Sequence, residues 1–257
     1  MTHRLEIVDL TCTRGDRPLF EGLGQQAGAG ELLHAVGSNG SGKTTLLRTL
    51  CGLSRPALGD IRWDGAPIRT LGEEYRQHVA YVGHLDGVQG DLTPLENLTA
   101  FGCLAGTKGA LNREELDDRA AAPGRAGEKR HVYSCSPETA LERMGLAAYR
   151  SFPAKILSQG QKRRLALARL LVVRKPLWIL DEPFTALDVR SCRLMAELLS
   201  EHLAHGGIAV ISSHQDFDLP SGAARKRIDL DDVRARGPYH PEQINGVRNA
   251  AVGRNPA

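Results

Sequence analysis

The fold is decided by the stretch Gly37-Ser38-Asn39-Gly40-Ser41-Gly42-Lys43-Thr44, which matches the phosphate-binding pattern G-x-x-x-x-G-K-[ST] at every fixed position. The apolar run 32–36 before it predicts a buried strand, and residues 45–50 after it predict the start of a helix. Glycines let the backbone wrap around phosphates, and a helix N-terminus places partial positive charge beneath them. We therefore expect Lys43 to reach the β- and γ-phosphates of a nucleoside triphosphate and the Thr44 hydroxyl to ligate Mg²⁺. The alternative is a chance glycine-rich turn, which this strand–loop–helix context disfavours.

Length and composition restrict the class of protein. A chain of 257 residues suits one large α/β domain, with room for a subdomain. Its net charge of +3, from 33 basic and 30 acidic residues, is too balanced to predict a nucleic-acid partner. The five cysteines form no C-x-x-C pair, so we expect neither a disulfide framework nor a metal site built on them. The first residues lack the apolar core of a signal peptide, and no apolar run approaches the roughly 20 residues that span a bilayer. We expect a cytosolic protein that reaches a membrane only through a partner.

Short, continuously apolar runs predict strands that are buried on both faces of a parallel sheet. They are 32–36, 79–82, 177–180 and 208–211, and each is followed by polar or small residues. Open parallel sheets bind their ligands at the carboxyl ends of the strands, which is where these residues fall. By contrast, residues 5–10 and 59–65 alternate in polarity, as half-exposed strands do. We therefore expect an antiparallel layer beside a parallel core.

Two carboxylates end the run at 177–180. Asp181 and Glu182 follow it directly, which is the arrangement of a Walker B strand. We expect Asp181 to hold Mg²⁺ through water and Glu182 to accept a proton from the attacking water as general base. The alternative interpretation of Glu182 is a partner for a helix dipole.

Further motifs give the chain a family resemblance. Leu-Ser-Gln-Gly-Gln at 157–161, Ala-Leu-Asp at 186–188 and the isolated His214 stand in the order and spacing of the ATP-binding cassettes of ABC transporters. The chain resembles that family over roughly residues 1–217. The resemblance implies a RecA-like phosphate-loop core, an antiparallel β layer and a helical subdomain, with ATP and Mg²⁺ bound. It also implies nucleotide contacts from the residues Ser158, Gly160, Gln161 and Asp188, and a switch role for His214. Without the resemblance, Ser158 and Gly160 could form an N-cap and a turn, and His214 could be an ordinary strand-end histidine.

Two positions point to a subfamily. Arg14 stands where most cassettes carry an aromatic residue that stacks on adenine, and a guanidinium can also lie flat on a purine. His84 stands where most cassettes carry a glutamine that contacts Mg²⁺ and water and couples to the membrane subunit. Together with Gln159 in the signature, these features resemble the ATPase subunits of the haem exporters of cytochrome c maturation.

That resemblance implies a place in the cell and a set of partners. The chain would bind integral membrane subunits, including haem-handling ones, at the cytoplasmic face of the bacterial inner membrane. It would form a head-to-tail dimer with a second copy of itself and sandwich two ATP molecules. The alternatives are a cassette for another transported substrate, a soluble ABC switch protein and a phosphate-loop kinase outside the family.

The chain is expected to hold one cassette, over residues 1–230. Its core would comprise 1–88 and 161–230, and its helical subdomain about 89–160, with a flexible insertion at 106–136 rich in Ala, Gly and mixed charge. Residues 231–257 lack apolar periodicity and predict a loose tail.

Basic side chains outside these motifs are expected to be solvated. The run Lys162-Arg163-Arg164 predicts a solvated helix face and not a nucleic-acid patch. His202 and His205 would share a helix face, and we expect them to be solvated and not metal ligands.

Overall fold

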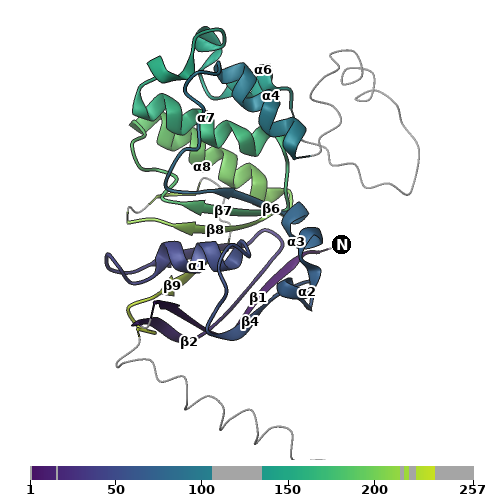
Figure 1. Ribbon diagram of the computed structural model, residues 1–257, viewed down its shortest axis with the longest axis vertical. Helices are drawn as coiled ribbons and strands as arrows, with labels where there is room; N and C mark the ends of the chain where they lie inside the picture. The colour runs from purple at the N-terminus through teal and green to yellow at the C-terminus, as the bar shows by residue number, and fades with distance from the viewer. Residues whose placement is uncertain (1, 16, 106–134, 215–216, 220–223, 235–257) are drawn as a thin grey trace, which may run out of the picture.

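The computed structural model describes residues 2–15, 17–105, 135–214, 217–219 and 224–234. Their strands are β1 (Arg4–Arg14), β2 (Arg17–Gly28), β3 (Leu32–Val36), β4 (Leu58–Trp63), β5 (Ala66–Pro67), β6 (Val79–Val82), β7 (Leu177–Asp181), β8 (Ile208–Ser212) and β9 (Arg225–Asp229). Their helices are α1 (Lys43–Leu50), α2 (Ile68–Leu71), α3 (Glu73–His78), α4 (Pro94–Leu104), α6 (Pro137–Arg143), α7 (Gln159–Val172) and α8 (Val189–Ala204), with short 3₁₀ turns η1 (Ala147–Tyr149) and η2 (Ala154–Ile156). These elements form layers, with α4, α6, α7 and α8 on one side of the β6–β8 strands and α1 and a second sheet on the other (Figure 1).

The central sheet is parallel and has the strand order β6-β7-β8-β3-β9. The predicted apolar runs form β3, β6, β7 and β8, so the prediction of a parallel core is confirmed. Sequence analysis missed β9, because its sequence Arg-Lys-Arg-Ile-Asp has one apolar residue. As an edge strand that pairs only with β3, it does not need the continuous apolarity of a central strand.

The second sheet is antiparallel, with the order β2-β1-β4-β5. This confirms the antiparallel layer that the alternating segments predict. Strands β4 and β5 form a hairpin in which Trp63 pairs with Ala66. Asp64 and Gly65 between them have φ values of 51° and 82°. Positive φ at both central residues is what a two-residue type I′ turn requires.

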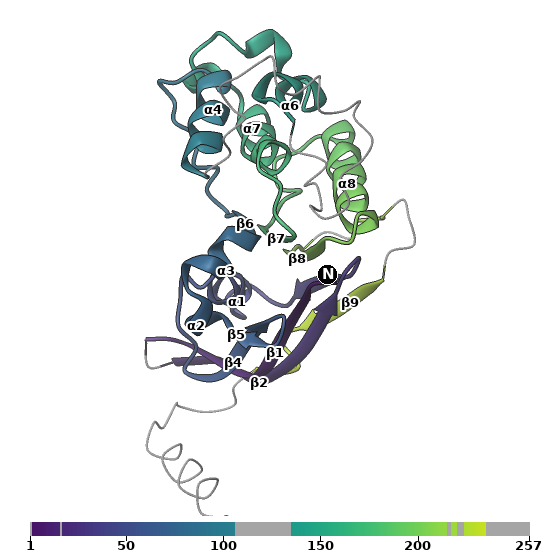
Figure 2. The same cartoon turned by 90° about the vertical axis from the view of Figure 1, so that its right-hand side faces the viewer.

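The parallel sheet is buried on both faces. Along β7, Trp178 and Leu180 belong to the apolar cluster on the side of α7 and α8, whereas Leu177 and Ile179 belong to the cluster that includes α1 and the antiparallel sheet. The two views show β7 and β8 between these groups of elements (Figures 1 and 2). Burial on both faces explains why the strand has no polar alternation.

The boundary expected for the tail is too early. Asp231 accepts hydrogen bonds from Ser38, Glu21 N donates to the carbonyl of Val233, and Arg234 bridges to Phe20. Residues 231–234 therefore pack against the cassette, and 235–257 lie outside the described residues. Most of the expected insertion, 106–134, also lies outside them. Ser136, the last residue of the expected insertion 106–136, is the N-cap of α6.

The expectation that His202 is solvated is wrong. Its ring is 3% exposed, stacks on Trp178 with 3.9 Å between ring centroids, and donates from Nε2 to the Ile208 carbonyl over 3.1 Å. Burial lowers the pKa of His202 to about 3, so the ring is neutral. His205 is exposed, as expected. Among the described residues, no cluster of three or more His, Cys, Asp and Glu side chains is arranged to hold a metal ion. In the same part of the chain, no helix is both long and apolar enough to cross a bilayer.

The buried His202 ring makes Gly207 a packing constraint. A Cβ added at Gly207 would lie 2.2 Å from Cε1 of His202, and the stack on Trp178 stops the ring from moving away. We expect Gly207→Ala to lower the free energy of unfolding by roughly 1–3 kcal/mol in urea denaturation. Gly24→Ala is the control, because an added Cβ there meets nothing within 4 Å. Equal stability of the two variants would contradict the packing described.

Candidate functional site

A cavity of about 450 Å³ lies beside the carboxyl end of β7 and the N-terminus of α1. Its lining includes many of the predicted site residues, namely Arg14, Asn39, Gly40, Gly42, Lys43, Thr44, His84, Asp181, Glu182 and His214. Leu19, Thr45 and Thr185 also line it and were not singled out from the sequence. Residues separated by up to 200 positions along the chain thus meet at the sheet edge where parallel sheets bind ligands.

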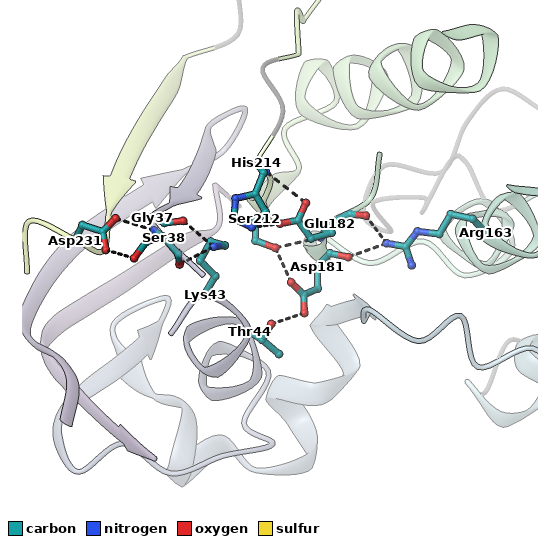
Figure 3. A network of polar contacts seen from close by, with 10 residues as sticks. All are labelled: Gly37, Ser38, Lys43, Thr44, Arg163, Asp181, Glu182, Ser212, His214 and Asp231. Carbon is teal, nitrogen blue, oxygen red and sulfur yellow. Dashed lines mark hydrogen bonds and ion pairs between the residues drawn. The ribbon is translucent and has the colours of Figure 1, made fainter. Parts of the chain in front are cut away.

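The loop before α1 is arranged around Lys43. The Lys43 ammonium donates to the carbonyls of Gly37 over 2.8 Å and Ser38 over 3.2 Å (Figure 3). Burial lowers the pKa of Lys43, while Glu182, Asp231 and Asp181 act in the opposite direction. Gly37 has a φ of 145°, and a Cβ there would lie 2.7 Å from the Ser41 hydroxyl, so the tight loop requires glycine. The loop holds a cation at the start of a helix, an arrangement suited to phosphate.

A second contact fixes this loop from the far end of the chain. The Asp231 carboxylate accepts hydrogen bonds from the Ser38 backbone N–H and from the Ser38 hydroxyl, both over 2.7 Å. These hydrogen bonds lower the pKa of Asp231. Sequence analysis missed the contact, because Asp231 follows a strand that was not predicted.

The Asp181 carboxylate connects three elements. It is 2% exposed, and it accepts from the Ser212 hydroxyl of β8 over 2.6 Å and from the Thr44 hydroxyl of α1 over 2.9 Å. Mg²⁺ prefers oxygen ligands and commonly takes only one or two from the protein, with waters and phosphate oxygens completing its shell. The Thr44 and Asp181 oxygens on the cavity wall fit that requirement.

Glu182 stands next to Asp181 in a strained conformation. Its φ is 51°, unusual for a residue with a side chain. One carboxylate oxygen, Oε1, lies 3.4 Å from Nε2 of His214, and Oε2 is 3.4 Å from the His214 backbone nitrogen. Oε1 accepts no hydrogen bond from any described residue. Oε1 is buried next to His214, and the Glu182 side chain lines the cavity, so the carboxylate is placed to accept a proton from a water bound beside it.

The signature residues lie outside this cavity. Ser158 caps α7 by accepting a hydrogen bond from the Gln161 backbone N–H over 3.3 Å, and the Gln161 side-chain oxygen accepts one from the Ser158 N–H over 2.9 Å. Asp188 caps α8 by accepting a hydrogen bond from the Ser191 backbone N–H over 2.7 Å. Gly160 packs so closely on Ala186 that a Cβ would lie 2.8 Å from the Ala186 carbonyl oxygen. Ser158 is therefore the N-cap of α7, and within one chain these residues do not line the cavity. Their contact with a nucleotide stays a prediction.

The expectation of a solvated face at Lys162-Arg163-Arg164 is wrong for Arg163. This side chain is buried and points at the end of β7, where it binds the carbonyls of Asp181 and Glu182 (Figure 3). A basic triplet at the start of a helix carries no sign of which member faces inward. Helical periodicity does not settle it, because the residues four positions after all three, Ala166, Leu167 and Ala168, are buried.

The chain is similar to known proteins over most of its length. A family profile described as ABC transporter matches residues 20–185. A cytochrome c biogenesis ATP-binding export protein CcmA from Nitrosospira multiformis is 47% identical over 88% of this chain and 98% of that protein. The protein of the same name from Pseudomonas aeruginosa is 43% identical over 84% of this chain and 95% of that protein.

Solved structures share the fold. An ABC transporter ATP-binding protein from Pyrococcus furiosus is 27% identical, with a TM-score of 0.69 over 90% of this chain and 100% of that chain. A dimeric ATP-binding cassette bound to ADP and Pi is 23% identical, with a TM-score of 0.64 over 82% of this chain and 88% of that chain. At that identity the second likeness concerns the fold alone.

The position of Lys43 generates a prediction for nucleotide affinity. Lys43→Ala removes the cation from the loop, and charge-assisted contacts to phosphate contribute roughly 1.5–3 kcal/mol each. We expect the dissociation constant for ATP, measured by titration, to rise at least about tenfold. Lys155→Ala is the control, because Lys155 pairs with Asp91 on the surface away from the cavity. Equal ATP affinity in the Lys43 variant and the wild type would contradict the interpretation of the loop.

Proposed function

Because this chain belongs to the ABC transporter family, and within it to the cytochrome c biogenesis ATP-binding export proteins, we propose that it is the ATP-hydrolysing motor of the haem exporter of cytochrome c maturation. The observation that carries the ATPase assignment is the meeting of Lys43, Asp181 and Glu182 at one cavity. The name shared by the relatives supports the link to cytochrome c biogenesis. That name does not mention haem, and we propose haem as the exported molecule. A cassette for another transported substrate is the remaining alternative.

In the proposed reaction ATP is the substrate. Lys43 binds the β- and γ-phosphate oxygens, and Glu182 accepts a proton from a water whose oxygen attacks the γ-phosphorus. The bond from that phosphorus to the bridging oxygen breaks, which yields ADP and phosphate. His214, at 3.4 Å from Glu182, orients the carboxylate and faces the γ-phosphate. Mg²⁺, held through Thr44 and Asp181, would offset the charge on the phosphate oxygens. His84, on the loop after β6, lines the same cavity and would contact the bound nucleotide.

Arg14 is the proposed contact for the base. Its exposed side chain lines the cavity beside Leu19, at the end of β1. A guanidinium is planar and weakly hydrated, so it can stack on adenine in place of an aromatic ring.

The position of the signature residues supports a dimer. Ser158, Gly160, Gln161 and Asp188 carry the family's motifs but do not line their own cavity. A second copy, related by a two-fold axis, would bring them to the γ-phosphate bound by the first and complete two equal sites. Val189, which is 73% exposed beside Asp188, would be covered in such a dimer. ATP would hold the dimer closed, and hydrolysis would release it.

The membrane partner is proposed to dock near His84. A second cavity of about 430 Å³ lies there, lined by residues that include Leu53, His84 and Leu85. Leu85 is 84% exposed and Leu53 is 55% exposed, an apolar pair suited to a protein partner. We place the chain at the cytoplasmic face of the bacterial inner membrane, bound to integral subunits of the exporter.

The first test concerns Glu182. Glu182→Gln keeps the shape of the side chain and removes the proton acceptor, so we expect kcat for ATP hydrolysis to fall on the order of 10²–10⁴-fold. ATP should still bind. The matched control is Glu197→Gln on the exposed face of α8, which should hydrolyse ATP at the wild-type rate. Near wild-type hydrolysis by Glu182→Gln would refute the proposed mechanism.

The second test concerns the partner. We expect the chain to co-purify in detergent with the integral membrane subunits expressed beside it, and Leu85→Glu to weaken that association by desolvating a charge at the interface. Leu104→Glu is the control, since Leu104 is 89% exposed at the end of α4, away from this cavity. Sedimentation of the chain with ribosomes instead of membranes would favour a soluble switch protein.

A further inference from the structure

Arg163 makes more contacts at the candidate site than its place in the sequence suggests. It lies on the first turns of α7 and is 3% exposed. The side chain does not line the cavity. In the close view of the polar network, Arg163 reaches Asp181 and Glu182 from the side opposite to Lys43 (Figure 3).

The guanidinium fork joins two segments of backbone. One terminal nitrogen, Nη2, donates to the carbonyls of Asp181 over 2.7 Å and Glu182 over 2.8 Å. The other, Nη1, donates to the carbonyl of Gly83 over 2.8 Å and to the Asp86 carboxylate over 3.1 Å. The four N–H groups on these two nitrogens are therefore all used. A lysine has three N–H groups on one atom and cannot reproduce this geometry.

The segments joined by Arg163 carry side chains that face the nucleotide cavity. Glu182 belongs to one, and His84 belongs to the loop between Gly83 and Asp86. Further contacts tie the same loop to α7, because Gln159 donates to the Asp86 carboxylate and Arg169 donates to the carbonyls of Asp86 and Gly87. The loop after β6 and the end of β7 are thus fixed to one helix.

The backbone conformation of Glu182 shows why its contact with Arg163 matters. A residue at a φ of 51° is held there by its surroundings, and the direction of its side chain follows from the backbone. The Glu182 N–H donates to Ser212 of β8, and the Glu182 carbonyl accepts from Arg163 over 2.8 Å and from the Thr185 N–H over 3.2 Å. Removal of the guanidinium would take the charged donor from both carbonyls and leave the Glu182 carbonyl with the weaker Thr185 N–H, so the peptide would be held less firmly.

We propose that Arg163 is a positioning residue for ATP hydrolysis, which holds the main chain of Asp181, Glu182 and Gly83 in the arrangement from which Glu182 and His84 face the nucleotide. The inference rests on the proposed role of Glu182. It assigns a task to a side chain that does not itself touch ATP. Since Arg163 makes no contact with the loop around Lys43, we expect ATP affinity to change little when Arg163 is replaced.

The test is steady-state ATP hydrolysis by the full chain in complex with its membrane subunits. Arg163→Ala should lower kcat by roughly 10–100-fold, because a misplacement of about 1 Å at a reacting group has effects of that size. The KM and the dissociation constant for ATP should stay within about twofold of wild type. Added ethylguanidine should restore part of the lost kcat. The matched control is Arg164→Ala, since Arg164 is the next residue of the same helix and donates to Met144 and Gly145 in the helical subdomain.

The conservative variant covers the case in which Arg163→Ala does not fold. Arg163→Lys keeps the positive charge beside Asp86 and loses the fork, so it should show the reduced kcat at unchanged ATP affinity. Wild-type kcat in Arg163→Lys, or in a folded Arg163→Ala, would overturn the proposal. An equal loss of ATP affinity and kcat would also overturn it, since that indicates a general structural role.

A double-mutant cycle tests whether Arg163 acts through Glu182. In single-turnover hydrolysis, Arg163→Ala should cause little further loss when it is added to Glu182→Gln. The same factor of loss in both backgrounds would overturn the proposal. Failure of the proposed function is distinguishable, because it would appear as hydrolysis by Glu182→Gln alone at a near wild-type rate.

Discussion

The structure depends on one buried carboxylate. Asp181 is almost inaccessible to water, and a buried charge is costly unless hydrogen bonds replace its hydration. The hydroxyls of Ser212 and Thr44 supply those bonds. Ser212 pairs with Asp181 in the register of β7 and β8, and Thr44 lies at the start of α1. The position of the phosphate-binding loop relative to the sheet is therefore coupled, through these hydrogen bonds, to the group that is proposed to hold Mg²⁺.

Sequence patterns predict the parts of this protein whose structure is determined by residues close together in the chain. Continuous apolarity marks β3, β6, β7 and β8, because burial on both faces acts on each residue of a strand. The loop from Gly37 to Thr44 is equally predictable, since its positive φ values and close approaches require glycine at fixed positions. The meeting of Lys43, Asp181 and Glu182 then follows from the rule that ligands bind at the carboxyl ends of parallel strands.

The features that sequence analysis missed depend on contacts between distant segments. Arg163, Asp231 and His202 look like solvated polar residues in the sequence, and each is fixed by a partner 6 to 193 positions away. Arg163 and His202 are buried because the fold supplies partners for them, and exposed Asp231 is held by Ser38; no local pattern records those partners. Strand β9 was missed for a related reason, because an edge strand can be highly charged.

The account divides the proposed catalytic machinery between two chains. One chain supplies Lys43, Glu182 and His214 around its cavity, and its own Ser158 is left outside. The most direct measurement is a structure of the Glu182→Gln chain with ATP and Mg²⁺. We predict a two-fold dimer in which each γ-phosphate lies between Lys43 of one chain and Ser158 of the other. A nucleotide bound away from the cavity, or one whose γ-phosphate is enclosed by a single chain, would contradict it.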